Sequence, residues 1–290
     1  MEQTQPDLAA RLGVDRGETR FPEVLCAVDG TPDSFAAVEQ AAALAGADGH
    51  LTLLSVTSFE ADGSYRGPAI GPLRVQAMLG RATAIAEAAG VSSTIEVDPA
   101  SPPSHVVLEW AADRDLLAMG APSTGWFGGL FAGGVAVAAE ASFTTPLLIA
   151  REAGSSSSTG GPVLVATDGH EGSEQLVLLA ARIARDRGER AILVHARVLE
   201  SNHRRDEVEH QAALLREFSG DACEVLIEHG NARAVIVEAA TASGASMIVM
   251  SSRRLKGPRA LGSVSRRVVH QGHCSVLLVP QELLAAPATA

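Results

Sequence analysis

The sequence contains one pattern of apolar segments twice, and this duplication constrains the possible fold more than any other feature. The segment VLCAVDG at 24–30 recurs as VLVATDG at 163–169. Three further pairs of apolar segments follow in the same order: 51–56 with 191–196, 115–120 with 246–251, and 146–149 with 275–278. Because the partners in all four pairs lie about 130 to 140 residues apart, the chain consists of two copies of one structural unit.

A Gly/Ser-rich segment, EAGSSSSTGG at 152–161, separates the two copies. It has almost no apolar side chains to bury, which is typical of a flexible linker. We therefore expect a first domain over 21–151 and a second domain over 162–284. Residues 1–20 and 285–290 are expected to be tails, the first of them flexible.

Within each copy, apolar segments rich in β-branched residues alternate with helical patterns. After Asp29, Thr31 suits the N-cap of a helix, Pro32 suits its first position and Gly46 can end it. Continuous apolar segments are typical of strands that are buried on both faces of a parallel sheet. We therefore expect an α/β fold of two tandem doubly wound domains, each a five-stranded parallel sheet flanked by about four helices.

Charge and composition narrow the class of protein. The formal net charge is −11 and 46% of the residues are hydrophobic, which indicates a globular protein without general affinity for nucleic acid or anionic membranes. No apolar stretch is long enough to span a bilayer, and the N-terminal segment lacks the apolar core of a secretory signal. Cys26, Cys223 and Cys274 form no CxxC pair, and the histidines show no metal-ligand spacing. We expect a cytoplasmic protein with reduced thiols and no structural metal.

Ligands of doubly wound sheets bind beyond the carboxyl ends of the strands, where the strand order reverses. Asp29 and Asp168 each follow the first strand of a copy. Asp-Gly is a common turn dipeptide, so the carboxylate can belong to a turn alone. It can also hydrogen-bond a ligand hydroxyl or amine, and its recurrence in both copies favours this second interpretation.

The loop after the fourth strand is the second candidate region, at 120–134 in the first copy and 251–264 in the second. Small residues between a strand and a helix expose backbone N–H groups, which is typical of an anion site. Ser263 can cap the helix that carries Val264, or it can also contact a phosphate.

The motifs together resemble those of the universal stress protein family in its tandem two-domain form. The resemblance rests on VLCAVDGTPDS and VLVATDGHEGS, on DLLAMG and SMIVMSS, and most specifically on LGSVSRRVVHQGHCSVLLVP near the end. It implies the adenine-nucleotide alpha-hydrolase-like fold. The ATP-binding members carry Gly-x-x-Gly, nine further residues and then Gly-Ser or Gly-Thr. Those glycines and the hydroxyl hold phosphates, and the first-strand aspartate faces the ribose or adenine.

The first copy departs from this pattern. Gly120 and Gly133 have the family spacing, but Ser123 replaces the second glycine and Gly134 replaces the hydroxyl residue. The missing hydroxyl removes one phosphate contact, worth about 1.5–3 kcal/mol where it is made. The implied but degenerate nucleotide site of domain 1 comprises Asp29, Val56, Gly120, Ser123, Gly133 and Gly134.

The second copy departs differently. Gly262-Ser263 is intact, whereas Ser251 and Arg254 stand at the first two glycine positions. Side chains there can block a phosphate, or Arg254 can itself grip one. The implied site of domain 2 comprises Asp168, Ala196, Gly230, Ser251, Arg254, Gly262, Ser263 and Val264. Six basic residues gather around its loop and none lies at 120–139, so we expect domain 2 to be the preferred nucleotide site.

The resemblance implies a universal stress protein, a regulatory module in the stress response. It implies that this module binds ATP, AMP or another adenine nucleotide, in some members together with Mg²⁺. Its implied partners are an unidentified protein and a second copy of the chain, in a homodimer of tandem pseudo-dimers. One alternative is a scaffold or partner-binding protein with degenerate sites that bind no nucleotide. A second is a slow ATP-hydrolysing enzyme, although the sequence has no HxGH, SGGxDS or Walker A motif and no evident catalytic residue.

Overall fold

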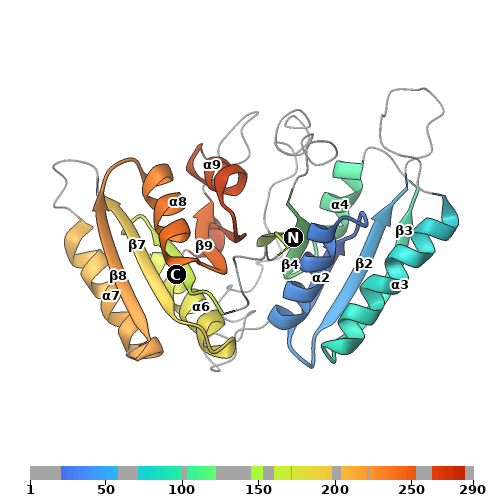
Figure 1. Cartoon of the computed structure of the whole chain (residues 1–290), viewed down its shortest axis with the longest axis horizontal. Coiled ribbons are helices and arrows are strands. Elements are labelled where there is room, and N and C mark those ends of the chain that lie inside the picture. The colour runs from blue at the N-terminus through green and yellow to red at the C-terminus, as the bar shows by residue number, and fades with distance from the viewer. Residues whose placement is uncertain are drawn as a thin grey trace, which may run out of the picture. The chain divides into compact units, whose positions relative to one another are not determined.

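The apolar segments of the sequence form the strands of the computed structural model (Figure 1). The structure describes residues 21–57, 71–99, 103–121, 145–152, 160–170, 172–197, 204–220, 222–252 and 263–284. Contacts divide the described chain into two compact units, 21–152 and 160–284. They are called domain 1 and domain 2 below, and each is described by itself.

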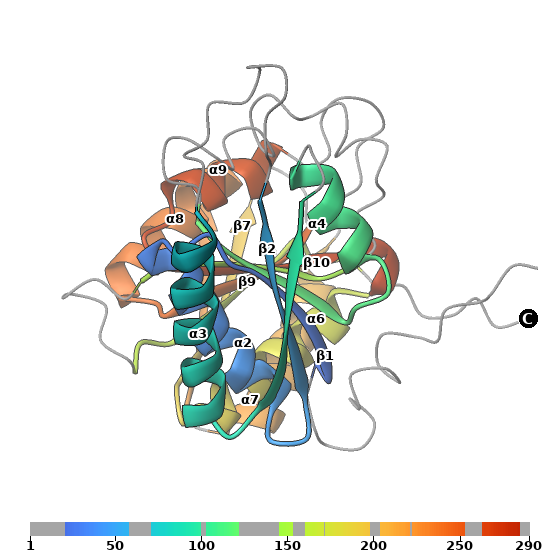
Figure 2. The same ribbon diagram turned by 90° about the vertical axis from the view of Figure 1, so that its right-hand side faces the viewer.

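Domain 1 is a parallel sheet with strand order β3-β2-β1-β4-β5. Its elements are β1 (Glu23–Ala27), α2 (Pro32–Ala45), β2 (His50–Val56), α3 (Pro72–Ala88), β3 (Ser92–Asp98), α4 (Pro103–Ala111), β4 (Leu116–Gly120) and β5 (Leu147–Ala150). Helices α3 and α4 lie on opposite faces of β2 (Figure 2). The fourth expected helix of this domain would fall within 122–144, outside the described residues.

Domain 2 repeats this order as β8-β7-β6-β9-β10, again with parallel neighbours. Its elements are β6 (Val163–Thr167), α6 (Ser173–Asp186), β7 (Ala191–Arg197), α7 (Arg205–Ser219), β8 (Cys223–His229), α8 (Ala232–Ser243), β9 (Met247–Ser252), α9 (Ser263–Gln271), β10 (Ser275–Pro280) and the 3-10 turn η4 (Gln281–Leu283). Helix α6 packs beside α7, and α8 beside α9. The predicted fold class, two tandem doubly wound α/β domains, is confirmed.

Burial follows the position of each strand in its sheet. Strands β1, β4, β6 and β9 lie inside the sheets and are almost wholly buried, as their continuous apolar segments predict. Strands β3 and β8 end their sheets and expose Ile95, Val97 and Ile227, and both strands also carry acidic residues, Glu96 and Asp98 in β3 and Glu224 and Glu228 in β8. Acidic side chains on a terminal strand discourage pairing with other chains.

Local signals set the ends of α2. The side chain of Thr31 accepts a hydrogen bond from the Ser34 nitrogen, Pro32 is the first helical residue and Gly46 ends the helix at φ 72°, all as predicted. Helix α6 begins differently, with Gly172 at φ 87° and no side-chain cap. None of the described helices is both long and apolar enough to cross a membrane. All three cysteines are free, with Cys26 and Cys274 buried and Cys223 half-buried.

Candidate functional site

The carboxyl edge of each sheet brings most of the predicted site residues together. The strand order reverses between β1 and β4 in domain 1 and between β6 and β9 in domain 2. Asp29 and Gly120 stand at the first of these points, and Asp168 and Ser251 at the second. This is the place where doubly wound sheets bind ligands.

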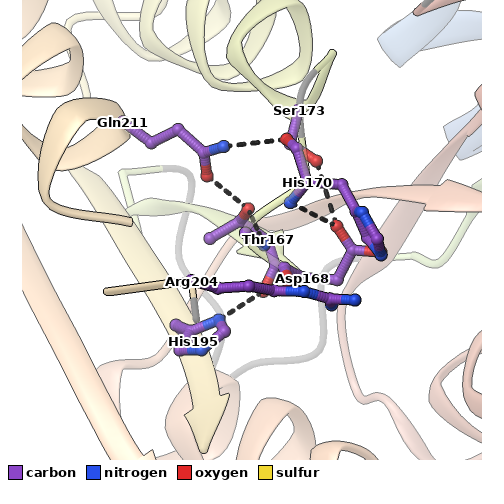
Figure 3. A network of polar contacts seen from close by, with 8 residues as sticks. Thr167, Asp168, His170, Ser173, His195, Arg204 and Gln211 are labelled. Atoms are coloured by element: carbon purple, nitrogen blue, oxygen red, sulfur yellow. Dashed lines mark hydrogen bonds and ion pairs between the residues drawn. The ribbon is translucent and has the colours of Figure 1, made fainter. Parts of the chain in front are cut away.

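Hydrogen bonds hold the Asp168 carboxylate at the carboxyl edge of the domain 2 sheet (Figure 3). Its Oδ1 accepts hydrogen bonds from the His170 nitrogen and from Ser173 Oγ, both at 3.1 Å. Its Oδ2 lies 3.9 Å from His170 Nε2. The Asp168 side chain is 32% exposed, so the carboxylate is oriented by the protein and still accessible to a ligand.

Two side chains from outside the β6–α6 turn, those of Gln211 and His195, hydrogen-bond to this turn and to the end of β6. These contacts are called the clamp below. Buried Gln211 of α7 accepts a 2.5 Å hydrogen bond from Thr167 Oγ1, and its Nε2 donates to the His170 carbonyl at 3.1 Å. Thr167 Oγ1 in turn accepts from the Gly169 nitrogen at 3.0 Å. His195 Nδ1 lies 3.0 Å from the Thr167 carbonyl and must carry a hydrogen to donate to it. The Thr167 hydroxyl and the carbonyls of Thr167 and His170 around Asp168 therefore have hydrogen-bond partners within domain 2 (Figure 3).

Arg204, just before α7, completes the clamp. Its guanidinium donates to the Asp168 carbonyl at 3.0 Å. A β-carbon at Gly169 would stand 2.9 Å from Val208 Cγ2 and 3.2 Å from Arg204 Cβ, and the residue has φ 69°. The glycine of the Asp168-Gly169 pair is thus required by both its backbone conformation and its packing.

The Asp29 turn of domain 1 is held more locally. Asp29 Oδ1 accepts from the Thr31 nitrogen at 2.9 Å and from Thr31 Oγ1 at 2.6 Å. Gly30 has φ 82°, and a β-carbon there would stand 2.9 Å from Met78 Sδ of α3. The recurrence of Asp-Gly therefore has a structural cause in both domains, and the ligand role of the two carboxylates stays a prediction.

Gly120 packs against the helix that follows β1. A β-carbon at Gly120 would stand 2.6 Å from the Ser34 nitrogen and 2.8 Å from the Asp33 carbonyl carbon. Its counterpart Ser251 is half-buried, and α6 begins five residues after Asp168 whereas α2 begins three residues after Asp29. In domain 1 the glycine at this position is therefore required by its packing against α2, and the effect of Ser251 on a ligand in domain 2 stays a prediction.

The remaining predicted residues lie at the same edge or outside the described chain. Val56 and Ala196 are half-buried near the ends of β2 and β7, and Val264 lies in the first turn of α9. Gly230 has φ 152°, donates to the Arg197 carbonyl at 3.2 Å and would place a β-carbon 3.3 Å from Val235 Cγ2. Helix α9 begins at Ser263, whose side chain is not described. Outside the described residues lie Ser123, Gly133, Gly134, Arg254 and Gly262.

No group of three His, Cys, Asp or Glu side chains in the described ranges is arranged to hold a metal ion. Gln211, Arg204 and His195 are site residues that the sequence analysis did not identify. They occur within or between helices and strands without any motif, so only the fold brings them to Asp168.

Comparison with known proteins decides the family. The model of the universal stress protein family matches residues 20–151 and again 161–280. The chain belongs to the universal stress protein family. A search of curated proteins found no match.

Solved structures of the same fold span nearly the whole chain. A universal stress protein from Archaeoglobus fulgidus DSM 4304 is 20% identical, with 89% of this chain and 95% of that chain covered and a TM-score of 0.70. A functionally unknown protein from Pseudomonas aeruginosa PAO1 is 17% identical, with 91% and 94% covered and a TM-score of 0.65. At these identities the likeness concerns the fold of two tandem universal stress protein domains.

Proposed function

We propose that this universal stress protein is a regulatory module of the stress response that binds ATP or another adenine nucleotide, and that domain 2 is its preferred site. Membership of the family supports the general function. The position of Asp168, half-exposed at the point where the strand order of domain 2 reverses, supports a ligand there.

The observation that carries the choice of domain is a difference in nitrogen donors at matching positions, one of which, Arg197, is charged. The strand registers of the two sheets define these positions. Domain 2 has His170, His195, Arg197 and His229 where domain 1 has Thr31, Ser55, Thr57 and Pro99. Because a nucleotide carries negative charge on its phosphates, the Arg197 guanidinium and the imidazole N–H donors of domain 2 suit it better than the neutral side chains of domain 1.

The described residues fit a nucleotide in domain 2. The carboxylate of Asp168 is an oriented acceptor for ribose or adenine donors, and neighbouring basic side chains supply donors for phosphate. The Gly262-Ser263 segment adds the hydroxyl that the family uses. When ATP is the ligand, Mg²⁺ accompanies it as a partner of the phosphates.

Domain 1 supports a different role. Its carboxyl edge is uncharged at the four matching positions, and Gly134 replaces the phosphate-binding hydroxyl. We propose that domain 1 binds nucleotide weakly or acts as a scaffold. The proposal also includes pairing of two chains into a homodimer, and a strictly monomeric mass by size-exclusion chromatography with light scattering would contradict that step.

The test is a set of ATP titrations. The purified protein is first denatured and released nucleotide is sought by mass spectrometry. ATP is then titrated against wild type, Asp168→Asn and Ser263→Ala, with Asp29→Asn as the matched control in domain 1. We expect both domain 2 substitutions to weaken binding about tenfold or more, and the control to bind like wild type.

Two outcomes would count against the proposal. An absence of binding by wild type at millimolar ATP would refute the nucleotide function. Binding that is unchanged in both domain 2 variants, or that is lost only in Asp29→Asn, would refute the choice of domain 2. Circular dichroism of each variant checks that it folds.

A further inference from the structure

We infer that Arg204 contacts the phosphate of the ligand in domain 2, from the α7 side of Asp168 and with His170 as its neighbour. This inference rests on the proposed nucleotide site. It adds a contact from Arg204, just before α7, to those that the family resemblance implies for the segment between β9 and α9.

Arg204 is exposed, and its side chain follows the Asp168-Gly169 turn. Its stem lies over the turn, with Cβ 3.2 Å and Cδ 3.6 Å from the position of a β-carbon at Gly169. Its guanidinium donates one hydrogen bond to the Asp168 carbonyl at 3.0 Å. A free arginine side chain loses much rotamer entropy when it binds, so a guanidinium that is already placed binds an anion at lower cost.

The guanidinium keeps donor capacity for a ligand. A guanidinium has five N–H donors, and this contact to the carbonyl uses one of them. Phosphate is the group that arginine recognises best, through two parallel charge-assisted hydrogen bonds. A backbone carbonyl alone does not need a guanidinium, because any neutral donor would satisfy it.

His170 stands next to this group. Its backbone is held at both ends, by Asp168 Oδ1 at the nitrogen and by Gln211 at the carbonyl, and its side chain is 38% exposed. Figure 3 shows the His170 ring and the Arg204 side chain beside the Asp168 carboxylate. A carboxylate acceptor with the His170 ring 3.9 Å away and the Arg204 guanidinium on the carbonyl of the same residue suits a ligand that carries both hydroxyl and phosphate groups, as in a nucleoside 5′-phosphate.

Domain 1 has an arginine, Arg74, at the position that matches Arg204, but Arg74 does not lie against the Asp-Gly turn of its domain. Met78 lies over Gly30 as Val208 lies over Gly169, and Arg74 precedes Met78 by the same four residues that separate Arg204 from Val208. Among the described residues, only Met78 has atoms within 4 Å of a β-carbon at Gly30. Arg74 is exposed and does not cover that turn.

The experiment compares ligands with and without phosphate. Adenosine, AMP and ATP are titrated by calorimetry against wild type, Arg204→Gln and the control Arg74→Gln. We expect Arg204→Gln to weaken AMP and ATP about tenfold or more and adenosine by less than about twofold. Binding by Arg204→Gln should also depend less on salt concentration, and Arg74→Gln should match wild type.

Equal losses for adenosine and ATP would overturn the inference, because Arg204 would then act only by holding the Asp168 turn. Unchanged ATP affinity would overturn it as well. If Arg204→Gln fails to fold, Arg204→Lys keeps the charge without the planar fork and should lose part of the phosphate preference.

Inorganic tripolyphosphate separates this inference from the proposed function. If wild type binds tripolyphosphate but no adenine nucleotide, the nucleotide proposal fails and Arg204→Gln still tests the phosphate contact. Tripolyphosphate binding that is unaffected by Arg204→Gln, or absent from wild type, overturns the inference.

Discussion

The α-carbon of Gly120 lies so close to the backbone nitrogen of Ser34 that a β-carbon on residue 120 would stand 2.6 Å from it. The end of β4 thus packs directly against the first turn of α2. In domain 2 the matching residue, Ser251, has a side chain, and α6 starts later in the chain after β6. The starting point of the first helix and the residue at the end of the fourth strand differ together between the two copies, while both helices are 14 residues long.

This packing predicts that Gly120→Ala destabilises domain 1. The added methyl group must push the backbone of α2 away, and overpacking of this kind costs about 1–3 kcal/mol in the free energy of unfolding. Both tryptophans, Trp110 and Trp126, belong to domain 1, so urea unfolding followed by tryptophan fluorescence reports on it. Ser251→Ala is the matched change in domain 2 and should leave this transition unmoved. If the Gly120→Ala protein is as stable as wild type, the backbone of α2 moves away from the added methyl group without lowering the free energy of unfolding, and the prediction is wrong.

The sequence predicted the fold well because its central strands are continuous apolar segments. Strand β6 has the predicted bounds, and the cap and the end of α2 at Thr31 and Gly46 follow from local chemistry. The strands that end each sheet, β3 and β8, were not delimited. In β3 polar and apolar residues alternate, and in β8 the only apolar run is Val225-Leu226-Ile227 between acidic residues, so neither strand has the long apolar segment of a central strand.

Fewer features of the candidate site than of the fold could be predicted from the sequence. The aspartates after β1 and β6 were identified because position after a strand is a local property. The contacts of Gln211 and Arg204 depend on how α7 packs over β6, and neither residue belongs to a pattern. The contact of Gly120 at the end of β4 with the first turn of α2 was likewise not predicted. Long-range packing decides these cases.

The cap of α2 gives a second prediction. Thr31 Oγ1 accepts from the Ser34 nitrogen at 3.2 Å and donates to Asp29 at 2.6 Å. Thr31→Ala removes both contacts and should lower the stability of domain 1 by about 0.5–2 kcal/mol. Thr31→Ser retains the hydroxyl and should recover most of the loss. The same fluorescence-detected urea transition measures both variants, and equal stabilities for alanine and serine would contradict the role of the hydroxyl.

The pH dependence of stability gives a third prediction. Burial raises the pKa of the Cys26 thiol well above its ordinary value. Below about pH 8.5 the thiol is protonated in both the folded and the unfolded chain and contributes no pH dependence. At higher pH only the unfolded chain loses the proton, so the free energy of unfolding should fall by up to about 1.4 kcal/mol per pH unit.

Cys26→Ala isolates this effect. The variant loses some packing at every pH, but its stability between pH 8 and 10 should fall less steeply than that of wild type. Urea unfolding at each pH measures the two slopes. Equal slopes would mean that Cys26 does not cause the alkaline loss.

The clamp on the Asp168 turn gives the last prediction. Gln211→Leu leaves the His170 carbonyl without its amide donor and Thr167 Oγ1 without its acceptor, and each buried group left unsatisfied costs about 1–3 kcal/mol. Hydrogen exchange of domain 2, followed by mass spectrometry on the full chain, should show faster exchange in β6 and α7. Gln175→Leu is the control, because Gln175 Oε1 has no hydrogen-bond partner among the described residues. Its loss should therefore leave exchange nearly unchanged.

A double-mutant cycle with Thr167→Val then separates the side-chain pair from the rest of the clamp. If the Thr167–Gln211 hydrogen bond is the main link, the double variant should be more stable than the sum of the single losses implies, by about 0.5–3 kcal/mol. This coupling follows because the second substitution removes a group that the first has already left unsatisfied. Additive losses would show that Gln211 stabilises the turn through the His170 carbonyl alone. In that case α7 would be tied to His170, two residues after Asp168 in the turn, and not to Thr167 at the end of β6.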